Sequence, residues 1–187
     1  MKRIRTVTLC GVIAALYVAL TWATLPIAFS PVQLRISEAL TVLPFFFPES
    51  ALALTVGCFI SNLLSGYGAL DLVFGPIATL LGGVFTALFG ISYRKRFSHG
   101  IRKVRFYEYL LASFPPVLFN SAIIPAVIAF SATEGNGFFA AYTAALLPFF
   151  ASEAASCFIL GIPLCFILNK YSFIDFIKGK QPKGRQL

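Results

Sequence analysis

Long apolar segments with few charges are the feature that most limits how this chain can fold. They cover residues 7–29, 38–48, 50–65, 71–92, 107–131 and 138–168. A helix needs about 20 apolar residues to cross a bilayer. Hydrophobic residues make up 58% of the chain and charged residues 12%, whereas soluble domains have about 45–50% and about 25%. Too little polar surface remains to face water, so we predict an all-α membrane protein with about six transmembrane helices.

The lysines and arginines indicate how these helices are oriented. Fourteen of the fifteen lie within residues 2–5, 94–105 and 170–185, and Arg35 is the exception. Basic residues gather on the cytoplasmic side of transmembrane segments. Four spans before the second cluster and six before the third place all three clusters on one side. We therefore predict that both termini are cytoplasmic, and that the net charge of +8 reflects topology rather than nucleic-acid binding.

The same pattern suggests the domain organisation. We expect residues 1–178 to form one transmembrane substrate-binding domain, and residues 179–187 to form a basic, disordered cytoplasmic tail. The first span is longer than the core of a usual signal peptide, so it is expected to remain in the mature protein. The segment 38–48 is too short to cross upright and is predicted to be tilted or broken.

Motifs for catalysis or metal binding are missing from the sequence. The four cysteines all lie in apolar segments without CxxC spacing, and His99 is the single histidine. Neither a GxxxxGK[ST] nor an HExxH motif is present. We predict that the chain is not an enzyme, has no catalytic residues, and holds no metal or cofactor.

A few polar residues inside the apolar segments are the candidate functional residues. An ionised side chain at the centre of a membrane helix costs about 2.5–3.5 kcal/mol on insertion scales, so such residues usually have a function. The outer half of the predicted bundle collects acids, amides and aromatic rings, whereas the inner half has almost none. We predict a pocket open to the outside, with these candidate residues: Glu38, Asp71, Glu153, Asn62, Asn120, Trp22 and Tyr67, with Tyr17 nearby.

Most of these residues also have a simpler explanation, which the sequence leaves open. Aromatic rings such as Trp22 often sit at the membrane interface, and amides such as Asn62 and Asn120 cross-link helices. Asp71 fits a helix N-cap, and Glu38 could pair with Arg35. Glu153 has no such alternative, because no basic residue shares its predicted depth.

The chemistry of this set favours a flat, nitrogen-rich ligand. A carboxylate can accept two parallel N–H bonds from an amidine-like edge, and an aromatic ring can stack on a heterocycle. No basic cluster or glycine loop is available in the pocket for a phosphate. A guanine-like base meets these demands.

Small residues recur every four positions along the first span, at Gly11, Ala15, Ala19 and Ala23. This spacing forms one smooth stripe, which allows close helix–helix approach in lipid. The stripe either packs within this bundle or forms a docking face for a partner protein.

Two sequence stretches resemble a known family. They are VQLRISEALTVLP at Val32–Pro44, followed by FPES, and DLVFGPIATLLGG at Asp71–Gly83. Both are similar to the QueT family, the predicted substrate-binding S components of energy-coupling factor (ECF) transporters associated with queuosine precursors. The resemblance implies a six-helix S-component bundle in the plasma membrane of a bacterium, with a substrate cavity on its outer side. It also implies Arg35, Glu38 and Asp71 as site residues.

The resemblance further implies a substrate and partners. The substrate would be a 7-deazaguanine, in its 7-cyano or 7-aminomethyl form, or queuine. The partners would be a membrane T subunit, facing the Ala15–Ala19 pair on the first helix, and two cytoplasmic ATPases that use the ATP. Three alternatives remain open: an S component for another vitamin or nucleobase, a stand-alone secondary transporter, and an intramembrane enzyme using Glu153 and Asp71. The sequence shows no inverted repeat, which weighs against the secondary transporter.

Overall fold

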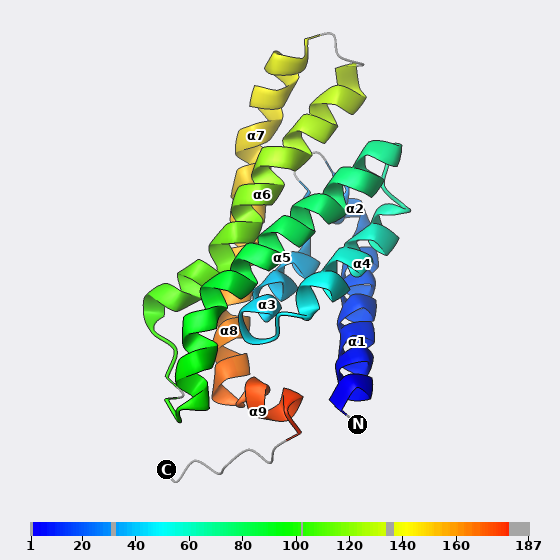
Figure 1. Ribbon diagram of the computed structural model, residues 1–187. Helices are drawn as coiled ribbons and strands as arrows, with labels where there is room; N and C mark the ends of the chain where they lie inside the picture. The colour runs from blue at the N-terminus through cyan, green and yellow to red at the C-terminus, as the bar shows by residue number, and fades with distance from the viewer. Residues whose placement is uncertain (1, 31–32, 102, 134–136, 180–187) are drawn as a thin grey trace.

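The computed structural model describes residues 2–30, 33–101, 103–133 and 137–179, and every regular element within these ranges is a helix. Figure 1 shows an elongated bundle of long helices around shorter ones. In chain order the elements are α1 (Lys2–Ala23), α2 (Leu25–Ala28), the 3₁₀ helix η1 (Ile36–Val42), α3 (Leu43–Phe46), α4 (Ser50–Asn62), α5 (Gly68–Ser98), α6 (Phe106–Thr133), α7 (Phe138–Ala154), the π-helical turn η2 (Ala155–Leu160), α8 (Gly161–Lys170) and α9 (Phe173–Ile177).

Four helical stretches within the described residues are long and apolar enough to cross a membrane, namely Arg3–Ala23, Gly68–Ser98, Phe106–Thr133 and Phe138–Lys170. Their most apolar windows have mean hydropathies of 1.7 to 2.0. Two shorter apolar stretches, Ile36–Phe46 and Ser50–Asn62, fall below that length. The 13 residues of α4 rise only about 20 Å, against a hydrocarbon core of about 30 Å. The chain is therefore an all-helical, multi-pass membrane protein.

The short second segment is a broken helix, one of the two forms that its length allowed. A 3₁₀ turn over Ile36–Val42 passes into one turn of α-helix, with Pro44 in the first turn of α3. Residues 37–42 are all buried. Irregular backbone at membrane depth is tolerated only where protein covers it, and here α1, α5, α6 and α8 pack around η1. The segment thus carries Glu38 into the interior rather than to the mouth of a pocket.

Close packing between α5 and α6 depends on a glycine. A Cβ on Gly82 would lie 2.9 Å from the Cα of Pro116, so any larger residue would force the helices apart. Without a hydrophobic driving force between helices in lipid, such close backbone contact is a main source of association.

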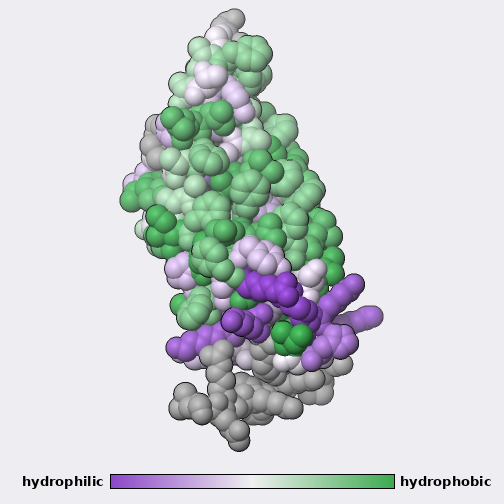
Figure 2. All heavy atoms as spheres, turned by 90° about the vertical axis from the view of Figure 1, so that its left-hand side faces the viewer, coloured by the Kyte–Doolittle hydropathy of each residue, from purple (hydrophilic) through white to green (hydrophobic). Residues whose placement is uncertain are grey.

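Hydrophilic residues gather at one end of the molecule, and apolar side chains cover most of the face shown in Figure 2. At that end Arg96 pairs with Glu108 at 2.6 Å, and Arg94 donates to the carbonyls of Phe45 at 2.6 Å and Ala87 at 2.7 Å. The N-terminus of α1 and the short α9 also lie at this end (Figure 1), where Arg5 donates to the Phe176 carbonyl. Both described ends of the chain therefore share the basic end of the bundle.

Candidate functional site

Two buried carboxylates from separate parts of the chain meet in the interior around one amide. Asn120 of α6 donates through Nδ2 to Glu153 Oε1 of α7 at 2.5 Å and to Glu38 Oε2 of η1 at 3.3 Å. The Tyr17 hydroxyl of α1 donates to the other oxygen of Glu38. All four side chains are at most 4% exposed. Four elements are thereby joined by one polar network, which brings together three of the candidate residues, Glu38, Asn120 and Glu153.

The backbone beside Glu153 is irregular. The π-helical turn Ala155–Leu160 begins two residues after Glu153 and interrupts the long helix formed by α7 and α8. Such turns are rare and frequently mark functional sites. From this turn the Cys157 thiol lies 3.8 Å from Glu153 Oε1 and 3.9 Å from the Glu38 carbonyl oxygen. The turn therefore adds a weak donor beside both acids.

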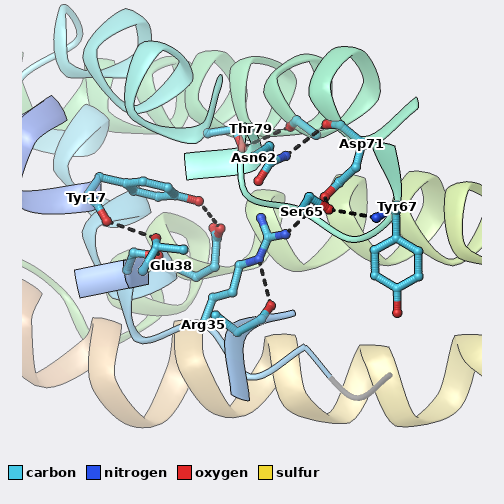
Figure 3. Close-up of polar contacts among 12 residues, drawn as sticks. Tyr17, Arg35, Glu38, Asn62, Ser65, Tyr67, Asp71 and Thr79 are labelled. Carbon is cyan, nitrogen blue, oxygen red and sulfur yellow. Dashed lines mark hydrogen bonds and ion pairs between the residues drawn. The ribbon is translucent and has the colours of Figure 1, made fainter. Parts of the chain in front are cut away.

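A second polar group lies at the start of α5 (Figure 3). Arg35 Nη2 is 3.5 Å from Asp71 Oδ2, and Arg35 Nε donates to the Ala28 carbonyl at 3.2 Å. The Ser65 hydroxyl donates to Asp71 Oδ2 at 2.5 Å, and Asn62 Nδ2 donates to the Asp71 backbone carbonyl at 2.9 Å. Arg35 thus forms its ion pair with Asp71, not with Glu38.

Asp71 is also too deep in its helix to be an N-cap, since α5 begins at Gly68 with Tyr67 as its N-cap. A glycine makes room for this arrangement, because a Cβ at Gly75 would overlap the Asn62 amide. Within the described residues, Asp71 Oδ1 and Asn62 Oδ1 have no hydrogen-bond partner. Both oxygens are therefore available as acceptors.

Gln33 is a buried polar residue that the sequence interpretation missed. It is 1% exposed, and neither Oε1 nor Nε2 has a hydrogen-bond partner within the described residues. Its backbone has a φ of +47°, a left-handed conformation that costs a non-glycine residue on the order of 1–3 kcal/mol. The available signal was its place two residues before Arg35 in the family-like stretch, as a lone amide among apolar residues.

The Glu38–Asn120–Glu153 network, Arg35 and Gln33 line one small cavity, with a free volume of about 10 Å³. Its lining consists of Gln33, Arg35, Glu38, Gly75, Thr79, Asn120, Ile124, Phe149 and Glu153. That volume holds about one water molecule, whereas pockets for small organic ligands measure about 300–1,000 Å³. The cavity is closed in this structure, so a ring-sized ligand requires the lining to separate.

Four predicted site residues are not in this lining. Asp71 and Asn62 contact it only indirectly, because Asp71 pairs with Arg35 of the lining and Asn62 donates to the Asp71 carbonyl. Trp22 is 43% exposed, because the neighbouring Thr21 and Tyr17 occupy the buried face of α1 and Trp22 projects about 100° away from Thr21. Tyr67 is half-buried, and its ring points away from the Arg35–Asp71 pair in Figure 3. The structure offers no aromatic stacking partner at either position.

The stripe Gly11, Ala15, Ala19 and Ala23 is exposed along its whole length. Added bulk at Gly11 would meet nothing within 4 Å in the described residues. Packing within this bundle therefore does not use the stripe. Among the described residues there is also no group of three or more His, Cys, Asp or Glu side chains placed to hold a metal ion.

A multi-pass helical bundle that buries acids, amides and an arginine in its interior has the construction of a membrane transport protein. A family model described as "QueT transporter" matches residues 7–170. The chain therefore belongs to the QueT transporter family, and as a member of a transporter family it is not an enzyme.

A curated relative supports the same assignment. The "Queuosine precursor transporter QueT" of Lactococcus lactis subsp. cremoris (strain MG1363) is 38% identical over 85 residues. That match covers 43% of this chain and 50% of the relative, so the chain spans about half the length of the curated relative that it matches. No solved structure matches this chain.

Proposed function

We propose that this chain is the substrate-binding S component of an ECF-type importer, and that it captures a queuosine precursor in the cavity described above. Membership of the QueT family and the name of the L. lactis relative support the substrate class. The ligand would be a 7-deazaguanine in its 7-cyano or 7-aminomethyl form, or queuine. It would enter from the outer side of a bacterial plasma membrane.

The buried Glu38–Asn120–Glu153 network is the observation that carries this proposal. Acidic side chains in a membrane interior are retained where they bind a solute or an ion. Carboxylate oxygens accept the ring and exocyclic N–H groups of a guanine-like base, and the Asn120 amide supplies both a donor and an acceptor. Arg35 already pairs with Asp71 at 3.5 Å. The side-chain atoms that remain for a ligand are therefore mainly hydrogen-bond acceptors.

The proposed architecture counts six transmembrane segments. The four long helices and the shorter Ile36–Phe46 and Ser50–Asn62 stretches make up this number. The shared basic end of the bundle supports cytoplasmic termini by the positive-inside rule. Residues 1–178 would form the single substrate-binding domain and 179–187 the cytoplasmic tail, of which residues 180–187 lie outside the described part of the chain.

The proposed partners are a membrane T subunit and two cytoplasmic ATPases. The exposed stripe on α1 supports the first of these, since small side chains on an open helix face permit close packing by another membrane helix. ATP would be used by the ATPases, and this chain would need no cofactor of its own.

A thermal-shift panel on the purified protein tests the proposed substrate. The panel contains 7-cyano- and 7-aminomethyl-7-deazaguanine, queuine, guanine, pterins, flavins and B vitamins. A ligand that binds only the folded state raises the Tm, and the stabilisation grows with the logarithm of one plus its concentration divided by its Kd. We expect a deazaguanine to give the largest shift. If a vitamin is the only compound that stabilises the protein, the proposed substrate is wrong and that vitamin takes its place. Recovery of a chemically altered ligand would contradict a transport function.

A further inference from the structure

We infer that Gln33 determines substrate specificity by pairing its side-chain amide with a cyclic amide (lactam) edge of the ligand, which presents a carbonyl acceptor beside an N–H donor. This inference rests on the proposed function, because it assigns a role within the same pocket. It concerns a residue that lies outside the acidic network.

The backbone of Gln33 holds its side chain in an uncommon direction. Its φ of +47° lies in the left-handed region, which glycine and asparagine adopt far more readily than glutamine. The backbone N–H is fixed there by the carbonyl of Ser30 at 2.9 Å and by its hydroxyl at 3.2 Å. Gln33 thus occupies a turn position that glycine would adopt more easily. From this position its long side chain forms part of the cavity lining.

The amide itself has unused bonding capacity. Both Oε1 and Nε2 lack a hydrogen-bond partner within the described residues, although the residue is 1% exposed. The facing groups already bond one another, since Asn120 donates to both Glu38 and Glu153. Buried amides are nearly always paired, so an unpaired one requires an explanation. A ligand in the cavity supplies the missing partner.

The geometry of a primary amide defines what that partner must offer. An amide presents one acceptor oxygen beside an N–H donor, which matches the carbonyl and N–H of a lactam. A carboxylate offers acceptors alone, so Glu38 and Glu153 match amine and ring N–H groups. A guanine-type base has both kinds of edge. A 6-unsubstituted analogue lacks the carbonyl acceptor and the ring N–H of the lactam, so it can form at most one hydrogen bond with the amide, through its N1 acceptor. Gln33 would therefore favour the 6-oxo base over the 6-unsubstituted one.

The test compares wild type with Gln33→Met, an apolar side chain of similar length. Affinities are measured for 7-aminomethyl-7-deazaguanine and for its 6-unsubstituted analogue, which lacks the lactam carbonyl, and the Tm is measured without ligand. We expect Gln33→Met to lose about tenfold or more in affinity for the 6-oxo ligand, as one lost buried hydrogen bond predicts. Its preference for the 6-oxo ligand over the 6-unsubstituted analogue should shrink, while its ligand-free Tm stays equal or rises, because two unpaired buried polar atoms are removed.

Ser121→Ala is the matched control. Ser121 also has a buried hydroxyl without a partner in the described residues, and it does not line the cavity. Its removal should leave both affinities unchanged. The double comparison separates ligand recognition from the general effect of removing an unpaired polar atom.

Three results would overturn the inference. One is unchanged affinity in Gln33→Met. Another is an equal loss for both ligands. The third is a lower ligand-free Tm, which would mean that the amide is bonded within the protein or to a bound water. This last readout needs no substrate, so it decides the role of Gln33 even if wild type binds no deazaguanine and the proposed function fails.

Discussion

Asn120 separates two acids that would otherwise repel each other in a dry interior. A single nitrogen, Nδ2, contacts Glu153 at 2.5 Å and Glu38 at 3.3 Å. Like charges interact strongly where the effective dielectric constant is low, so a donor between them stabilises the pair. In the proposed function, a ligand with N–H groups takes over the same position. The three side chains would then act as one acceptor site, with the Asn120 amide in place of the ligand when none is bound.

The two acids should both contribute to binding. We expect Glu153→Gln and Glu38→Gln each to weaken deazaguanine binding at least about tenfold, because each change replaces an acceptor oxygen of the carboxyl group with an N–H donor. Isothermal titration of the purified variants measures the loss. Glu108→Gln is the control, since this acid pairs with Arg96 at the basic end of the bundle. Unchanged affinity in both variants would disprove the proposed site.

The Arg35–Asp71 pair should matter for stability. Both side chains are at most 6% exposed, so Asp71→Asn leaves a buried guanidinium without its charge partner. Breaking a buried ion pair from one side typically costs about 3–5 kcal/mol. We expect a clearly lower Tm for Asp71→Asn, partly restored in the double variant Arg35→Gln with Asp71→Asn. Equal Tm values for wild type and Asp71→Asn would show that the pair adds little.

At the scale of elements, the short irregular pieces form the site and the long helices frame it. Glu38 lies on a 3₁₀ turn, and a π turn begins two residues after Glu153. The sequence predicted the first irregularity from the length of segment 38–48. It did not predict the second at Ala155–Leu160, because a π turn has no residue signature comparable to that of proline.

The helix faces show where prediction from sequence reached its limit. The mid-span positions of Asn120 and Glu153 indicated their depth. Glu38 was expected at the outer end of its short span, whereas the structure places it in the interior beside the other two. Trp22 shares that outer half, but in an almost wholly apolar helix no polar stripe indicates which side faces lipid. Gln33 was missed for a different reason, since its burial depends on backbone folding around a turn rather than on periodicity.

The exposed stripe on α1 leads to a test of partner binding. Ala15→Leu with Ala19→Leu adds bulk to an open face, so we expect ligand affinity and Tm to stay near wild type. Co-purification with the proposed T subunit and ATP-dependent uptake should fall at least about tenfold, because close helix approach is lost. Ala140→Leu with Ala144→Leu on α7 is the control, with the same spacing on another exposed face. Equal loss in both pairs would rule out a specific role for the stripe.

At the scale of the whole molecule, the buried polar residues of the candidate site and the basic residues lie at different depths along the bundle. Asp71 stands at the start of α5, whereas Arg94 and Arg96 stand near its end. A rise of 1.5 Å per residue separates them by on the order of 30 Å, about the thickness of the hydrocarbon core. The apolar surface between them is the part that lipid would cover.

This separation makes the orientation testable. In a Cys10→Ser background, cysteines are placed singly at Ser98, beside the basic residues, and at Ser131, towards the other end of α6. Both positions are exposed, and Cys58, Cys157 and Cys165 are buried. A membrane-impermeant maleimide applied to intact cells should label Ser131→Cys and spare Ser98→Cys until the cells are permeabilised. The reverse labelling would invert the proposed topology.

The internal hydrogen bonds that line the small cavity have a consequence for solute release. In the free protein the carboxylates of Glu38 and Glu153 are already bonded by Asn120 and Tyr17. In the proposed function, an incoming solute would displace these internal bonds, and the protein would recover them when the solute leaves. This competition would limit the residence time of the solute as well as its affinity. A carrier that must unload its cargo on every cycle benefits from an interior that closes on itself when empty.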